Sequence, residues 1–374
     1  MKKLAFVKQD VYSDLYICGT DEKRPDEILF SSNGRVGPIG LWEDFDVDFY
    51  IVKECPEKEC QVWKKEFSAE NIKIMERSRD TPLNEIKGQE FKDPGSVHTP
   101  SEFSVSVDEI PWEKYDIVFS MNVSVPTRIV MNHPEALWVH MSGESNIFAD
   151  KAYYGYDVCL SQQTTGLIDY RKHRLDFPYT YVGGETLENI VRKNKDIVIN
   201  EKKKGIFAEI NCVTERPVTK VPQLDPVSEK TGQPLIFHKQ NIKDNLQSLI
   251  NAKYYAKWGG RKTRGNGAIE AISLGTPVLI RPDDIIHRHI IPKEGWIFSA
   301  QELAEKISYY DLHENAYEDL LKKERELVRL FCHDYPLAGL LEFERRKRET
   351  GRPNRMIRYN HTISRFMQKL NRIV

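Results

Sequence analysis

The stretch that decides the fold is Gly259–Pro282, which reads GGRKTRGNGAIEAISLGTPVLIRP. A basic, glycine-rich loop runs into a short helical pattern near Ala268, and Gly275 ends that pattern before the apolar strand Pro277–Ile280. Glycines let a backbone approach a ligand closely, and the free amides at the start of a helix favour an anion. The stretch therefore predicts an α/β unit whose loop binds a phosphate-bearing ligand. A loop, helix and strand that only pack together are the alternative.

The loop also carries the side chains that a nucleotide diphosphate needs. Basic residues and glycines would hold the phosphates, and an acid one turn into the helix would hold the ribose hydroxyls. The predicted set is Arg261, Lys262, Arg264, Gly265, Asn266, Gly267 and Glu270. The spacing fits neither a Walker loop nor a dinucleotide fingerprint. On the alternative interpretation, Glu270 is there only because an acid suits the first turn of a helix.

Similar strand–helix units extend outward on both sides of this stretch. In the second half the expected strands are Gly205–Ile210, Leu235–His238 and Tyr254–Trp258, and in the first half they are Leu4–Val7, Phe49–Val52, Tyr115–Ser120, Ala136–Met141 and Tyr156–Ser161. Such near-continuous apolar strands are typical of parallel sheets covered on both faces. A chain of 374 residues exceeds one core, so we expect two domains with a ligand cleft between them.

Composition and cysteine spacing indicate the compartment of the protein and whether it spans a membrane or binds zinc. The net charge is −1, and no apolar run is long enough to span a membrane. Lys8 and Asp10 interrupt the first apolar run too early for a signal peptide, so that run is interpreted as a strand. The six cysteines are sparse and scattered, which indicates reduced thiols and a cytoplasmic protein. Cys55 and Cys60 have no second ligand pair nearby, so no zinc site is expected.

The carboxyl-terminal tail is strongly basic. From Arg345 to Val374 there are ten Lys or Arg residues and a single acid, Glu349, with apolar residues between them. Such a helix suits the surface of an anionic membrane, or it crosses back to pack on the first domain. Nucleic acid is not an expected partner, because no aromatic-rich basic sheet motif accompanies the tail. The expected division is 1–195, 196–340 and a basic helix over 341–374.

A second candidate site follows the strand that ends at Met141. The sequence WVHMSGESNIF, residues 138–148, places Glu144 directly after the turn Ser142-Gly143. Parallel α/β folds carry their chemistry at the carboxyl ends of strands, so Glu144 is a candidate general base. A solvated acid in a turn is the alternative. Asn122, at the end of the neighbouring strand, is a candidate acceptor contact together with Ser142 and Gly143.

The stretch around Glu270 resembles the donor-site helix of the GT-B glycosyltransferases. The resemblance rests on Gly265-Asn266-Gly267, Glu270-Ala271 and Gly275–Val278, and it continues through Gly295–Ser299 and Glu302–Ala304. It implies an α/β fold of GT-B type, with two Rossmann-like domains facing across a cleft, and it implies that Glu270 binds the nucleotide ribose. Many retaining members carry a second Glu eight residues earlier, where this chain has Lys262.

Residues 142–181 are similar to the first domain of α-1,3-fucosyltransferases, in which an acid after a Gly is the proposed catalytic base. Residues 210–216, INCVTER, resemble the segment that opens their donor domain. The resemblance implies that Glu144 is the base. Arg216 and Lys220 are candidate diphosphate contacts, with a solvated loop as the alternative. The Thr-Glu-Lys donor motif of that family does not precede Glu270.

These patterns together predict an inverting glycosyltransferase. It would move a sugar from a nucleotide-sugar donor to a glycan or lipid-linked acceptor without a metal or other cofactor. The only Asp-x-Asp, in EDFDVD at 43–48, precedes a strand and is interpreted as an acidic loop. The alternatives are a retaining GT-B transferase and a non-catalytic protein that binds nucleotides or glycans on the same fold.

Overall fold

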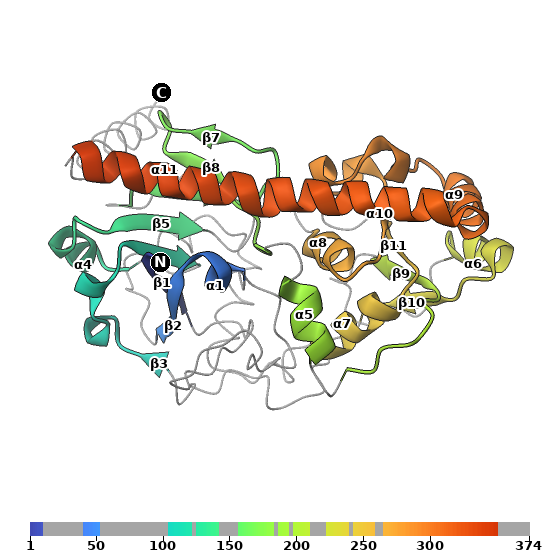
Figure 1. The fold of residues 1–374 in the computed structure, drawn as a ribbon, viewed down its shortest axis with the longest axis horizontal. Coiled ribbons are helices and arrows are strands. Elements are labelled where there is room, and N and C mark those ends of the chain that lie inside the picture. The colour runs from blue at the N-terminus through green and yellow to red at the C-terminus, as the bar shows by residue number, and fades with distance from the viewer. Residues whose placement is uncertain are drawn as a thin grey trace, which may run out of the picture.

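The computed structural model describes residues 1–9, 40–52, 104–121, 125–141, 156–182, 186–193, 197–209, 222–238, 242–258 and 265–350. These residues form two α/β units side by side along the longest axis of the molecule, and one long helical rod runs past both (Figure 1). The described part of the first unit contains an eight-stranded sheet, and that of the second contains a four-stranded sheet.

The first sheet has the strand order of a Rossmann fold. From one edge to the other the order is β3-β2-β1-β4-β5-β6-β8-β7, and every neighbouring pair is parallel except β7 with β8. Its first six strands follow the dinucleotide-fold order 3-2-1-4-5-6. The strands are β1 (Lys3–Gln9), β2 (Asp46–Val52), β3 (Ser104–Val105), β4 (Ile117–Met121), β5 (Leu137–Met141), β6 (Val158–Ser161), β7 (Ile168–Asp169) and β8 (Arg174–Asp176).

Both faces of the first sheet are buried, as the apolar strands predict. On β1, Leu4 and Phe6 join one core cluster, whereas Ala5 and Val7 join a second cluster on the opposite face. This alternation follows from the period of two residues along a strand. The described helices of the unit are α1 (Leu41–Asp44), α4 (Thr127–Asn132) and the short 3₁₀ turns η4 (Val107–Glu109) and η5 (Trp112–Lys114).

The second sheet is parallel throughout, in the order β10-β9-β11-β12. Its strands are β9 (Ile206–Glu209), β10 (Leu235–Phe237), β11 (Tyr254–Lys257) and β12 (Val278–Ile280). Helices α5 (Thr186–Lys193), α7 (Ile242–Asn251) and α8 (Asn266–Ser273) pack on one face. Helices α6 (Asp225–Thr231) and α9 (Ala300–Leu312) pack on the other. Three 3₁₀ turns follow β12, namely η6 (Pro282–Asp284), η7 (Arg288–Ile290) and η8 (Lys293–Gly295).

The α/β class predicted from the sequence is confirmed, because the described residues form two units, each built on a largely parallel sheet. The cleft between the units stays a prediction, because residues 142–155, 210–221 and 259–264, which follow strands of the two sheets, lie outside the described residues.

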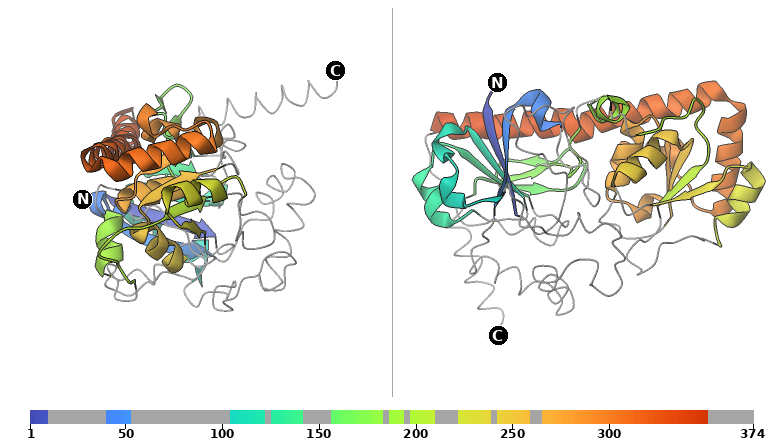
Figure 2. Two further views of the ribbon diagram at one scale, coloured as in Figure 1. Left: turned by 90° about the vertical axis from the view of Figure 1, so that its right-hand side faces the viewer. Right: turned by 90° about the horizontal axis from the view of Figure 1, so that it is seen from below.

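A helical rod joins the two units. It consists of α10 (Glu314–Arg329), a π-helical turn η9 (Leu330–Asp334) and α11 (Tyr335–Thr350), and the right-hand view in Figure 2 shows it running past the two sheets. Leu340 and Phe343 of α11 enter the core of the first unit. Lys347 lies 2.6 Å from a buried oxygen of Asp157, which fixes the end of the rod to that unit. The predicted third segment, 341–374, is described only as far as Thr350.

One detail of the sequence interpretation was wrong. The acidic stretch 43–48 is not a loop, because Asp46 and Asp48 belong to β2, which pairs with β1 from its first residue onward. The antiparallel pair β7–β8 went unnoticed because its strands are only two and three residues long.

The Asp44 carboxylate contacts residues from two segments that connect the units, the stretch between β8 and α5 and the helical rod. Asp44 on α1 accepts a hydrogen bond from the Tyr181 hydroxyl at 2.5 Å, and Tyr181 lies between β8 and α5. The Nε2 atom of His333, in the π-helical turn, lies 3.0 Å from the same oxygen of Asp44, and its Nδ1 atom lies 2.7 Å from Asp334. Both ring nitrogens therefore face carboxylates, an arrangement that only the doubly protonated imidazolium satisfies with two donated hydrogen bonds.

We expect this tether to weaken as the pH rises. The hydrogen bond to Asp44 raises the pKa of His333 above 6.5 despite burial, and Asp334 adds to the effect. The contribution to the free energy of unfolding is therefore complete below about pH 6.5 and is lost as the pH rises through the folded-state pKa. Urea unfolding of wild type across that range should show the loss, and His333→Gln should abolish it. His313→Gln is the control, since that ring faces the Tyr309 carbonyl. An unchanged pH dependence in His333→Gln would contradict the assignment.

Candidate functional site

The candidate site lies where the second sheet changes direction. The connection from β9 to β10 carries α6 on one face, and the connection from β10 to β11 carries α7 on the other. Open parallel sheets bind ligands beyond the carboxyl ends of the strands at such a switch point. Here the neighbouring strands are β9 and β11, and their last residues, Glu209 and Lys257, are paired directly in register.

Glu209 and Lys257 form a buried ion pair at this edge. The Lys257 ammonium lies 2.9 Å from Glu209 Oε1, and Lys257 is only 1% exposed. The Tyr255 hydroxyl donates a hydrogen bond to Oε2 of the same carboxylate. Burial alone would raise the pKa of Glu209, but the charge of Lys257 and these hydrogen bonds outweigh it and hold the pKa below its usual value. The Glu209 carboxylate is therefore ionised.

Helix α8 begins against this pair, and its glycines make the contact possible. A Cβ on Gly267 would lie 2.7 Å from Glu209 Oε2 and 3.1 Å from the Tyr255 hydroxyl. A Cβ on Gly265 would lie 2.8 Å from a ring carbon of His287 and closer still to Ile285. Since real Cβ atoms do not approach so closely, the two glycines bring the first-turn amides of α8 to the edge of the sheet.

His287 completes the wall of the site beside Gly265. It is 1% exposed, and burial together with the nearby Lys257 charge lowers its pKa to about 3, so the imidazole is neutral. Among the described residues its Nδ1 atom has no hydrogen-bond partner. The site thus combines a buried charge pair, the amino end of a helix and a neutral histidine, which suits a ligand with both anionic and polar groups.

The structure describes four of the predicted site residues. Gly265, Asn266, Gly267 and Glu270 all lie at or in α8, and Glu270 is buried at 7% exposure. The other predicted residues lie outside the described part of the chain. These are Glu144, Asn122, Ser142, Gly143, Arg216, Lys220, Arg261, Lys262 and Arg264.

The strand ends that precede some of these residues are described. Strand β5 ends at Met141, three residues before Glu144, and β4 ends at Met121, one residue before Asn122. At the same edge, Ser120 Oγ lies 2.9 Å from His140 Nδ1, and both side chains are buried. Because β4 and β5 are parallel neighbours in register, both strands end at the same edge of the first sheet.

The sequence interpretation missed Glu209, Lys257, Tyr255 and His287. The first three lie within the strands that it predicted, where they were counted as parts of a buried sheet. The available signal was a charged residue near the carboxyl end of each of two otherwise apolar strands. His287 belongs to the irregular segment after β12 and carries no comparable signal in the sequence.

No family model matches this sequence, and no curated protein does. Solved structures similar in fold include a β-glucosyltransferase of phage T4 (10% identity, 93% of this chain and 98% of that chain, TM-score 0.40). A sucrose-phosphate synthase from Thermosynechococcus elongatus is similar at 12% identity (94% and 99%, TM-score 0.43). Anabaena HepE, in complex with UDP and glucose, is similar at 9% identity (94% and 99%, TM-score 0.35). At such identities the likeness concerns the fold alone.

The part of the chain that the structure describes contains neither a candidate membrane-spanning helix nor a metal-binding cluster. No helix there is both long and apolar enough to cross a membrane. No group of three or more His, Cys, Asp or Glu side chains there is arranged to hold a metal ion. Asp46 and Asp48 of the Asp-x-Asp lie along β2, and the Asp48 carboxylate accepts a hydrogen bond from the Tyr115 hydroxyl at 2.8 Å.

Proposed function

We propose that the chain is a glycosyltransferase whose second unit binds a nucleotide-sugar donor at the switch point between β9 and β11. The observation that carries the proposal is the contact of Gly267 with the buried Glu209–Lys257 pair. It brings the amino end of α8 to the edge of the sheet where parallel folds bind their ligands, with the Lys257 ammonium, paired to Glu209, close by. A diphosphate needs such amides and charge, and it leaves more readily where they are fixed in advance.

The finer parts of the proposal come from the sequence. Glu144 is the general base of an inverting transfer, as the fucosyltransferase-like segment implies, and Asn122, Ser142 and Gly143 contact the acceptor. Arg216, Lys220, Arg261, Lys262 and Arg264 approach the diphosphate, and Glu270 binds the ribose. The acceptor is a glycan or a lipid-linked acceptor. The basic tail either packs back on the first unit, as its residue Lys347 does against Asp157, or rests on an anionic membrane surface. Transfer from radiolabelled UDP- and GDP-sugars to glycan acceptors tests the reaction directly.

That assay also separates the alternatives. Turnover with inversion at the anomeric carbon is the expected result. Product with the donor's anomeric configuration would favour a retaining GT-B transferase. A protein that binds the donor but neither hydrolyses nor transfers it would be a non-catalytic nucleotide-binding protein, and that outcome would contradict the proposed activity.

Gly267→Ala should weaken nucleotide binding by about tenfold or more. The new methyl group would meet the Glu209 carboxylate at 2.7 Å, so α8 must move away from the edge of the sheet. A tenfold loss corresponds to about 1.4 kcal/mol. Titration calorimetry with the preferred nucleoside diphosphate measures the effect. Gly232→Ala is the control, because its Cβ would meet nothing within 4 Å, so that only its φ of +67° disfavours the substitution. Equal affinities in the two variants would refute the assigned contact.

Chelation should leave activity largely intact. In the proposed site, helix amides and basic side chains take the place of a cation beside the diphosphate. Transfer rates with and without an excess of EDTA provide the measurement, and manganese added back provides the control. Complete loss with EDTA that manganese restores would show that the reaction depends on a metal.

A further inference from the structure

The carboxyl end of α8 is held by an unusual set of cations. Lys203, three residues before β9, places its ammonium group 2.9 Å from the Leu274 carbonyl, 2.8 Å from the Gly275 carbonyl and 2.9 Å from Thr276 Oγ1. These three acceptors match the three protons of an ammonium group. The last carbonyls of a helix lack partners within it, and cations are favoured at its carboxyl end, so Lys203 meets both needs.

The backbone at Gly275 and Thr276 leaves space for these cations. Gly275 has φ +75°, and a Cβ there would lie 3.0 Å from Nη2 of Arg325 and 3.6 Å from Nζ of Lys203. Thr276 accepts from Lys203 and donates to the Leu249 carbonyl at 2.7 Å, so it ties the same point to α7. The Gly-Thr pair of the sequence is therefore explained by what the end of α8 must bind.

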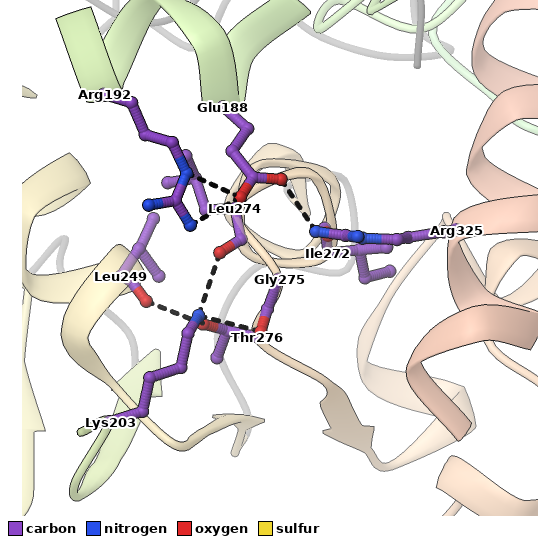
Figure 3. A network of polar contacts seen from close by, with 9 residues as sticks. All are labelled: Glu188, Arg192, Lys203, Leu249, Ile272, Leu274, Gly275, Thr276 and Arg325. Carbon is purple, nitrogen blue, oxygen red and sulfur yellow. Dashed lines mark hydrogen bonds and ion pairs between the residues drawn. The ribbon is translucent and has the colours of Figure 1, made fainter. Parts of the chain in front are cut away.

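A carboxylate from a third helix completes the network, as Figure 3 shows. Glu188 on α5 lies 2.8 Å from Arg192 on the same helix and 2.8 Å from Arg325 on α10. Arg325 thus lies between Glu188 and the turn at Gly275. Contacts from α5, from α10 and from the segment before β9 therefore converge on the carboxyl end of α8.

Because helix α8 is short, a displacement at its carboxyl end also displaces its amino end. It has eight residues, which span about 12 Å at 1.5 Å per residue. Six of the eight are buried, so the helix moves as a unit or not at all. At its amino end, Gly265 and Gly267 lie so close to the wall of the site that neither position has space for a Cβ. A small axial shift at Lys203 would therefore change the fit at the candidate site.

We propose that Lys203 is a positioning residue for the donor site: its ammonium group fixes the carboxyl end of α8 and thereby sets the position of the amides that bind the donor phosphates. This inference rests on the proposed function of the site. Lys203 itself touches no ligand, since it lies at the opposite end of the helix.

The test compares Lys203→Met with Lys202→Met, the exposed neighbour. The probe is whichever of UDP, GDP, ADP and CDP wild type binds most tightly, titrated by calorimetry well below the melting temperature of each variant. We expect Lys203→Met to weaken binding about tenfold, which corresponds to about 1.4 kcal/mol, and Lys202→Met to leave it unchanged. Lys203→Gln, which retains an amide donor, should fall between them.

The pH dependence of binding separates positioning from a purely structural role. Burial lowers the pKa of Lys203 to about 8, while the charged groups facing it act in both directions: Glu188 and Glu318 raise this pKa, and Arg325 and Arg192 lower it. In wild type and in Lys202→Met, nucleotide affinity should therefore weaken as the pH rises through about 8, when the ammonium loses its proton. In Lys203→Met that change should be absent.

The possible results of these measurements separate a failure of the inference from a failure of the proposed function. If Lys203→Met melts at a lower temperature but binds the probe with wild-type affinity and wild-type pH dependence, Lys203 only stabilises the fold and the inference is wrong. If wild type shows no change in affinity as the pH rises through the pKa of Lys203, the inference also fails, and this test needs no variant. If wild type binds none of the four nucleotides, the proposed function itself is overturned at the first step.

Discussion

Glu144→Gln is expected to lower turnover by about 10²–10⁴-fold while nucleotide affinity stays unchanged, because a positioned general base contributes a factor of that size. The substitution keeps the shape of the side chain and removes the proton acceptor for the attacking hydroxyl. Glu144 follows β5 by three residues in the sequence, and β5 ends at the edge of the first sheet where the buried Ser120–His140 pair lies. An effect on turnover without an effect on donor binding is what a base in the acceptor unit should produce.

Steady-state kinetics with saturating donor, together with calorimetry, measure the two quantities separately. Glu135→Gln is the matched control, because Glu135 is an exposed acid just before the opposite end of the same strand. Near-wild-type turnover in Glu144→Gln would make Glu144 a turn residue and would place the base elsewhere. A loss of nucleotide affinity equal to the loss of turnover would instead indicate a misfolded site.

Lys257→Met is expected to destabilise the fold by about 3–5 kcal/mol, because it leaves the Glu209 carboxylate buried without its counter-charge. Lys253→Met is the control from the same segment of chain. Its ammonium lies 2.5 Å from Asp311, but both side chains are more than one-fifth exposed, and such pairs contribute about 1 kcal/mol or less. Urea unfolding followed by circular dichroism measures both variants.

The double variant Glu209→Gln with Lys257→Met distinguishes stability from function. Replacing both members of a buried pair is often nearly neutral, so most of the lost free energy of unfolding should return. Nucleotide binding should not return, because the positive charge beside α8 is still missing. A double variant as unstable as Lys257→Met, or a Lys257→Met protein no less stable than Lys253→Met, would contradict the description of this pair.

Much of the fold follows from the order of apolar strands. The runs at Leu4–Val7, Tyr115–Ser120 and Ala136–Met141 were recognisable because both faces of these strands are buried, which leaves few polar interruptions. Strand β2 was only half recognised. Its first residues alternate acidic and apolar, and pairing with β1 prevails over the low strand preference of Asp46 and Asp48.

The part of the candidate site that could be predicted from the sequence is the start of α8, where glycines are the signal. Gly265 and Gly267 signal close approach of a backbone, and the structure identifies the groups that they approach. The approached groups, Glu209 and Lys257, are far apart in the chain and become partners only when β9 pairs with β11. A single sequence carries no record of that pairing. The function of Gly275-Thr276 likewise depends on Lys203 and Arg325, which arrive from distant segments.

The central claim is that the carboxyl edge of the second sheet binds the nucleoside diphosphate of a sugar donor. Its most direct test is thermal unfolding of wild type and Gly267→Ala with a panel of nucleoside diphosphates and nucleotide sugars. A ligand that binds only the folded state stabilises it by about 2.7 kcal/mol at one hundred times its dissociation constant. The account predicts a higher melting temperature for wild type with at least one diphosphate and its sugar conjugate, and a much smaller rise for Gly267→Ala. A panel that leaves the wild-type melting temperature unchanged, or that raises both proteins equally, would contradict it.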